Sequence, residues 1–160
     1  MKKKEVIVYT SGTWDLFHIG HLNILEKSAA LGDKLIVGVS SDELIYEYKG
    51  IKPVIPFEQR MRIVESIGVV SQVVRQDILT DIRQLKEFDV DIVTIGDDWK
   101  YLEGLEWMKS QSGKKVVYLP YTGGISTTSI KKIIIDNANE IIQASLDREL
   151  KNWTGRKQEE

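Results

Sequence analysis

Short apolar, β-branched runs alternate along the chain with segments whose apolar residues recur at helical spacing. The run Lys34–Val39 is apolar on both faces, which is typical of a central parallel strand. The run 69–74 is broken by Ser71 and Gln72, which indicates a half-exposed edge strand. The sequence therefore predicts an α/β fold, a single Rossmann-like domain with a five-stranded parallel sheet and helices on both faces. The expected strands are 6–10, 34–39, 69–74, 90–95 and 115–119.

Helix-start residues and helical periodicity predict the helices between and after these strands. The last helix carries a stripe of apolar residues, which we expect to pack on the domain or across a dimer interface. We predict a catalytic domain at 1–136, followed at 137–160 by a C-terminal helical extension and a frayed tail. Three of these helices are predicted by apolar residues at helical spacing. They are Leu22, Leu25 and Ala29 in the first, Leu102, Leu105, Trp107 and Met108 in the second, and Ile142, Leu146, Leu150 and Trp153 in the third.

Composition narrows the possible functions. The 160 residues carry a net charge of −2, which argues against a nucleic-acid partner, and the chain has no cysteine. Disulfides, thiolate metal sites and cysteine nucleophiles are therefore excluded. No stretch approaches the length of a membrane span, and the run after Lys2–Lys4 is too short for a signal-peptide core. We expect a cytoplasmic protein with no membrane partner.

The segment 10–21, Thr-Ser-Gly-Thr-Trp-Asp-Leu-Phe-His-Ile-Gly-His, reads as a strand, a tight turn and a helix start. Helix N-termini bind phosphates, and both histidines of the chain, His18 and His21, lie on this first helical turn. Two imidazoles aimed at one point would stabilise charge on a transferring phosphoryl group, although they could also be ordinary surface histidines. Gly12 allows the turn, Gly20 allows a close approach, and Thr13 and Asp15 add polar groups.

Two later segments carry polar residues directly after predicted strands. Asp97 and Asp98, in Gly-Asp-Asp-Trp, could coordinate a hard cation or fix ribose and base, or could be plain turn residues. In the segment 121–130, glycines precede Ser126, Thr127 and Thr128, whose hydroxyls could bind a second phosphate cluster or merely cap a helix. The first of these segments, 96–99, should face the same crevice as the histidines, since ligands bind beyond the carboxyl ends of parallel strands.

The segment 12–21 resembles the signature of the HxGH nucleotidylyltransferases, and 124–128, Gly-Ile-Ser-Thr-Thr, resembles the second signature of their cytidylyltransferase branch. The resemblance covers roughly residues 5–135 and is strongest with the glycerol-phosphate members. It implies CMP transfer from CTP to a small phosphorylated alcohol, with glycerol 3-phosphate as the first expectation, giving a CDP-linked product and pyrophosphate. It also implies Mg²⁺ bound mainly through the CTP phosphates, a homodimer, and a role in cell-surface polymer biosynthesis.

The same resemblance implies roles for individual residues. Those expected in catalysis are His18, His21 and Lys49. Those expected at the nucleotide are Thr10, Gly12, Thr13, Asp15, Gly20, Gly96, Asp97, Trp99, Thr122, Ile125, Ser126, Thr127 and Thr128. Those expected at the acceptor are Arg60, Tyr121 and Lys52. No residue is expected to ligate a metal directly.

Tyr121 departs from the pattern, because glycerol- and choline-type relatives usually have an arginine there and this chain does not. A tyrosine here resembles the cytidylyltransferases of phosphonate pathways. The same chemistry on a phosphonate, or on another phosphorylated capsule or surface-polymer precursor, therefore stays open. A nucleotide-sensing protein without activity is the alternative from another class. A P-loop kinase and a dinucleotide oxidoreductase are disfavoured, since neither glycine-rich motif occurs.

Overall fold

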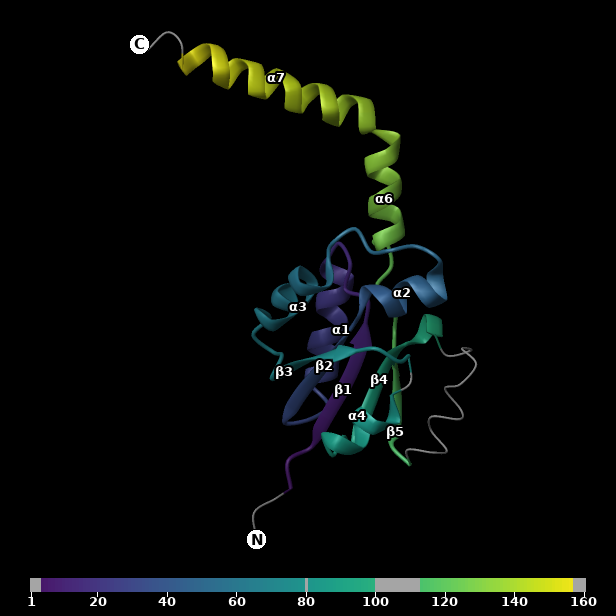
Figure 1. Cartoon of the computed structure of the whole chain (residues 1–160). Helices are drawn as coiled ribbons and strands as arrows, with labels where there is room; N and C mark the ends of the chain where they lie inside the picture. Colours follow the sequence, from purple (N-terminus) through teal and green to yellow (C-terminus); the bar gives the residue numbers. More distant parts are fainter. Residues whose placement is uncertain (1–3, 80, 100–112, 157–160) are drawn as a thin grey trace. The chain divides into compact units, whose positions relative to one another are not determined.

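Five parallel strands form one sheet in the order β3-β2-β1-β4-β5 (Figure 1). The computed structural model describes residues 4–79, 81–99 and 113–156, with side chains described as far as 149. The expected α/β class, with its five-stranded parallel sheet, is confirmed. The strands are β1 (Ile7–Gly12), β2 (Lys34–Ser40), β3 (Gln72–Gln76), β4 (Ile92–Gly96) and β5 (Lys115–Leu119).

Alternation along the strands produces a core on each side of the sheet. Val8 of β1 packs on one side with Leu25 and Val64, which come from α1 and α3. Tyr9 points to the other side and packs with Leu85 of α4. Helices thus cover both faces, as predicted. The helices of the first unit are α1 (Ile19–Ala29), α2 (Asp42–Lys49), α3 (Phe57–Glu65) and α4 (Ile82–Glu87), and α6 (Thr127–Asp136) and α7 (Ala138–Arg156) follow later in the chain.

Strand β2 is central and strand β3 is at the edge, as the hydrophobic pattern predicted. The predicted bounds of the edge strand, 69–74, were wrong. Strand β3 begins only at Gln72, and Val70 precedes it in a turn where its N–H donates to the Ile67 carbonyl (2.9 Å). The valines at 69 and 70 therefore end the connection from α3 rather than opening the strand.

The chain divides into two compact units, Met1–Ile125 and Ser126–Glu160, and the second contains α6 and α7. Ile142 and Leu146 of the predicted apolar stripe are exposed, while the side chains of Leu150 and Trp153 lie outside the described residues. The helix predicted around Leu102 to Met108 also lies outside them. Within the described residues, no helix is both long and apolar enough to cross a membrane.

Candidate functional site

The carboxyl ends of β1 and β4 mark the point where the strand order reverses, since β2 and β3 extend the sheet one way and β5 the other. Open α/β sheets bind ligands outside this point. The segment after β1 leads to the histidines, and the segment after β4 is a short 3₁₀ turn, Asp97–Trp99. Both predicted polar segments therefore lie at the edge where a ligand would bind.

The two histidines form a reciprocal cap at the start of α1. His18 is the N-cap, and its Nδ1 accepts from the N–H of Gly20 (3.0 Å). The Nδ1 of His21 accepts from the N–H of His18 (3.4 Å), and the rings stack with centroids 3.9 Å apart. A Cβ on Gly20 would lie 2.8 Å from Cε1 of His18, so the glycine makes room for that imidazole. The sequence predicted the helical turn but not the capping.

This geometry fixes the tautomer of both rings. A neutral imidazole whose Nδ1 accepts a hydrogen bond carries its proton on Nε2. Burial lowers the pKa of His18, and burial lowers the pKa of His21 to about 4, assisted by the charges of His18 and Lys49 against an opposing contribution from Asp15. Near pH 7 both rings are therefore neutral and each has one N–H, at Nε2, to donate.

The turn before the histidines has a conformation that bulky residues rarely adopt. Trp14 and Leu16 have positive φ values of 55° and 47°. The indole N–H of Trp14 donates to the carbonyl of Gly38 (2.9 Å), which anchors the turn on β2. Gly12, expected to allow the turn, is instead the last residue of β1, and its lack of a Cβ leaves room for the indole, since a Cβ there would lie 3.1 Å from Trp14 Cε2.

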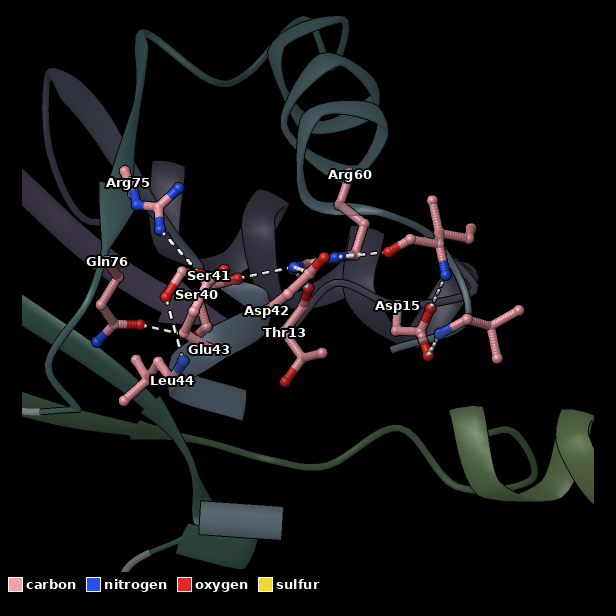
Figure 2. Close-up of polar contacts among 12 residues, drawn as sticks. Thr13, Asp15, Ser40, Ser41, Asp42, Glu43, Leu44, Arg60, Arg75 and Gln76 are labelled. Atoms are coloured by element: carbon pink, nitrogen blue, oxygen red, sulfur yellow. Dashed lines mark hydrogen bonds and ion pairs between the residues drawn. The ribbon is translucent and has the colours of Figure 1, made fainter. Parts of the chain in front are cut away.

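Arg60 of α3 is completely buried, and its guanidinium holds the turn by hydrogen bonds (Figure 2). Its Nη1 donates to the carbonyl of Thr13, and its Nη2 donates to the carbonyl of Ser40 (2.8 Å) and to the carboxylate of Asp42 (2.6 Å). Its Nε donates to the carbonyl of Ile55 (2.9 Å). We expected this arginine to contact the acceptor, but its guanidinium is enclosed by protein oxygens. In this structure it is a positioning residue.

Asp15 is buried under the connection between α2 and α3. Its two carboxylate oxygens accept from the backbone N–H groups of Val54 (3.0 Å) and Ile55 (2.9 Å), as Figure 2 shows. The acid therefore fastens residues 54–55 to the turn that carries the histidines, which agrees with an orienting role more than with direct contact to a nucleotide. Lys52, in the same connection, is exposed.

Lys49, the last residue of α2, lies beside the end of β1. Its Nζ donates to Oγ1 of Thr13 (3.2 Å) and lies 5.3 Å from the centroid of the Tyr48 ring. The hydroxyl of Tyr48 bonds to the same Thr13 oxygen (3.0 Å), and its ring meets Trp99 edge-on, with centroids 6.2 Å apart. The structure thus brings Thr13, Lys49 and Trp99 together. Tyr48 was missed, since it was counted only among the apolar positions of α2.

The segment after β5 is hydrogen-bonded to the 3₁₀ turn that follows β4 and to helix α1. The N–H of Tyr121 donates to the carboxylate of Asp97 (3.0 Å), and Nδ2 of Asn23 donates to Oγ1 of Thr122 (3.1 Å). Thr122 lies next to Gly20, on the first turn of α1. Asn23 was also missed, because nothing in its sequence context distinguishes it from a surface residue.

Several predicted residues have structural contacts of their own. The hydroxyl of Thr10 is buried and donates to the carbonyl of Thr94 (3.2 Å), so this side chain belongs to the core. Gly96 leaves space for the Asp98 carboxylate. Ile125 accepts a hydrogen bond at its carbonyl from the Tyr121 hydroxyl (3.2 Å).

The hydroxyl residues of the second signature belong to the second unit. Ser126 is the N-cap of α6, where its Oγ accepts from the N–H of Ser129 (2.9 Å) and its own N–H donates to the Ser129 Oγ (2.8 Å). Thr127 and Thr128 open the helix. Capping by Ser126 is therefore present, and phosphate binding by these three residues stays a prediction.

Comparison with known proteins agrees with this geometry. Residues 9–133 match the cytidylyltransferase-like family, and the chain belongs to that family and is an enzyme of that class. Glycerol-3-phosphate cytidylyltransferase of Bacillus spizizenii is 43% identical over 130 residues, which are 81% of this chain and 95% of that protein. The protein of the same name from Staphylococcus aureus is 39% identical over 131 residues, covering 81% and 93%.

A solved structure supports the fold. The lipopolysaccharide core biosynthesis protein of Thermoplasma volcanium has 25% sequence identity and a TM-score of 0.64, covering 76% of this chain and 100% of that one. The family assignment made from the two signatures is confirmed, and helix α7 follows the region that the family match covers.

Proposed function

We propose that this enzyme transfers CMP from CTP to a small phosphorylated alcohol, with glycerol 3-phosphate as the first candidate. The observation that carries the proposal is the pair of neutral imidazoles capping α1 with both Nε2 atoms available as donors. The curated relatives named glycerol-3-phosphate cytidylyltransferase support the choice of nucleotide and acceptor.

In the proposed reaction, a phosphate oxygen of the acceptor attacks the α-phosphorus of CTP. A new bond forms from that oxygen to the α-phosphorus, the bond from the α-phosphorus to the bridging oxygen breaks, and pyrophosphate leaves with the bond's electron pair. The product is a CDP-linked alcohol. Catalysis is mainly positioning and charge stabilisation, as in other phosphoryl transfers.

His18 and His21 would donate their Nε2 protons in hydrogen bonds to the α-phosphate and to the leaving pyrophosphate. Because both rings are neutral near pH 7, they would act as hydrogen-bond donors rather than as acids that surrender a proton. Lys49, held beside Thr13, would contact the phosphates from there, and the N-terminus of α1 would add its partial positive charge. Thr122, Trp99 and Asp97 would line the nucleotide side, with Ser126, Thr127 and Thr128 at the β/γ end.

We further propose that Mg²⁺ enters bound to the triphosphate, where it would neutralise charge. Over residues 4–79, 81–99 and 113–149, no group of three His, Cys, Asp or Glu side chains is placed to hold an ion. A homodimer in the cytoplasm, serving cell-surface polymer synthesis, completes the proposal.

The test is pyrophosphate release by the purified protein with Mg²⁺, crossing CTP and ATP against glycerol 3-phosphate, phosphocholine and 2-aminoethylphosphonate. We expect release with CTP and one acceptor. A folded protein that binds CTP but is silent with every acceptor would favour a nucleotide sensor. Loss of CTP binding as well would refute the proposal.

Tyr121 decides between acceptors in this proposal. Its side chain is 51% exposed, and its hydroxyl donates to the carbonyl of Ile125. A phosphonate or another surface-polymer precursor is the second candidate, because an uncharged tyrosine replaces the expected arginine. The variant Tyr121→Arg should raise kcat/KM for glycerol 3-phosphate by about tenfold if the missing cation limits acceptor binding. If the relative kcat/KM values for the three acceptors were unchanged in Tyr121→Arg, other residues would determine acceptor specificity.

A further inference from the structure

Tyr48 lies where three proposed site residues meet, although no role was predicted for it. Its hydroxyl is 3.0 Å from Oγ1 of Thr13, its ring lies 5.3 Å from Nζ of Lys49, and its ring edge meets Trp99. Tyr48 is half-buried, in contrast to Tyr46, which is 55% exposed on the same helix. The two tyrosines therefore face different surroundings.

We propose that Tyr48 is a positioning residue that holds the ammonium of Lys49 at the end of β1, ready for the phosphates of the nucleotide. The inference rests on the proposed function, in which Lys49 contacts those phosphates. Tyr48 acts through Lys49 and does not itself touch the reacting atoms.

Two contacts of different kinds would hold the lysine. The ring of Tyr48 offers its negative face to the ammonium, which is a cation–π interaction. The hydroxyl of Thr13 accepts a hydrogen bond from Nζ, and the hydrogen bond to Tyr48 fixes the orientation of that hydroxyl. A free lysine side chain loses rotamer entropy when a ligand immobilises it, so a lysine already held near its working position loses less on binding.

The places of Thr13 and Lys49 along the backbone also favour a positioning role for Tyr48. Thr13 directly precedes Trp14, which has a positive φ. The carbonyl oxygen of Thr13 accepts a hydrogen bond from the guanidinium of Arg60. The Thr13 side chain is thus a fixed point to which a long, exposed lysine can be bound. Gly50, with φ 69°, caps α2 immediately after Lys49 and adopts without strain the left-handed conformation in which the chain leaves the helix.

The test is a double-mutant cycle on the whole protein, with CTP as the varied substrate. Tyr48→Leu should raise the KM for CTP by about three- to tenfold and leave kcat within about twofold, since an exposed cation–π pair and one hydrogen bond are lost. Tyr48→Phe retains the ring and should recover part of the loss. Tyr46→Leu, two residues earlier on the same helix, is the matched control and should change nothing.

The coupling to Lys49 gives the sharpest result. Lys49→Met alone should raise the KM for CTP by roughly tenfold or more, because a charged hydrogen bond is lost. Adding Tyr48→Leu to Lys49→Met should have no further effect. Losses that simply add in the double variant would show that Tyr48 acts independently of Lys49 and would overturn the inference. A lower kcat accompanied by a lower Tm in Tyr48→Leu would show that Tyr48 serves stability instead and would overturn it as well.

Calorimetric CTP binding separates this inference from the proposed function. A wild-type protein that does not bind CTP would refute the function itself. A wild-type protein that binds CTP, with the same Kd in Tyr48→Leu and in Tyr48→Phe, would refute only the role of Tyr48.

Discussion

Around the ends of β2 and β3, polar side chains bond to the protein itself, whereas beyond β1 the two histidines keep a ring nitrogen that the cap does not use. Ser40 donates to the side chain of Gln76 (2.9 Å), a contact drawn in Figure 2, both residues are 2% exposed, and Arg60 is completely buried. On the other half of the edge, Lys49 is exposed, and each histidine uses only Nδ1 within the cap. This edge of the sheet thus has two halves. The rigid half lies around the ends of β2 and β3, and the other half, around the ends of β1 and β4, has hydrogen-bond donors that the described part of the chain does not use.

The difference shows how a site is kept in place. Over the described residues no buried side-chain nitrogen or oxygen lacks a hydrogen-bond partner, and in the rigid half all three guanidinium nitrogens of Arg60 donate to protein oxygens. Its role is to fix the Thr13–Leu16 turn in a conformation that costs free energy. Changes in the rigid half should therefore affect stability first, and changes in the other half should affect activity first.

Arg60→Met should have the largest effect on stability. The substitution leaves the Asp42 carboxylate and three carbonyl oxygens without their donor, which typically costs about 3–5 kcal/mol of unfolding free energy. Urea unfolding measures the loss, and Arg62→Met, at an exposed position of the same helix, is the control. A loss no greater than that of the control would contradict the rigid role of Arg60.

His18→Asn should have the largest effect on activity. Asparagine can cap α1 through its side-chain oxygen but has no N–H at the position of Nε2. We expect kcat to fall by about 10²- to 10³-fold, the usual cost of one lost transition-state donor, with Tm nearly unchanged. The rate of pyrophosphate release is the measurement. Turnover within a few-fold of wild type would mean that the imidazole pair is not the catalytic group.

His21 gives the smaller, pH-dependent effect. Its pKa is about 4 in the folded protein and about 6.5 when unfolded, so below pH 6.5 the unfolded state takes up a proton that the folded state does not. Stability is complete above pH 6.5 and is lost as the pH falls toward 4, by about 2–3 kcal/mol. Urea unfolding at pH 7, 5.5 and 4 should show a shallower loss in His21→Asn. Parallel curves for the two proteins would contradict the lowered pKa.

Much of the fold could be predicted because its signals are local. The apolar run of β2, the helix-start residues at Ser41 and Asp81, and the glycine after Lys49 all act within a few residues, and each marks an observed boundary. The start of β3 was wrong, since valines favour strands wherever they occur and only pairing with β2 decides which of them join the sheet. The candidate site residues were predicted from the two signatures and the family resemblance they carry, whereas the contacts of those residues were not predicted.

The sequence by itself determined the family, the α/β class and the histidine turn, because each depends on residue types at fixed short spacing. Only the tertiary structure decided that Arg60 is enclosed, that Asp15 fastens residues 54–55, and that Tyr48 meets both Thr13 and Trp99. These contacts join residues far apart in sequence. Their partners are set by strand order and by the strained turn after β1, and no local pattern records either.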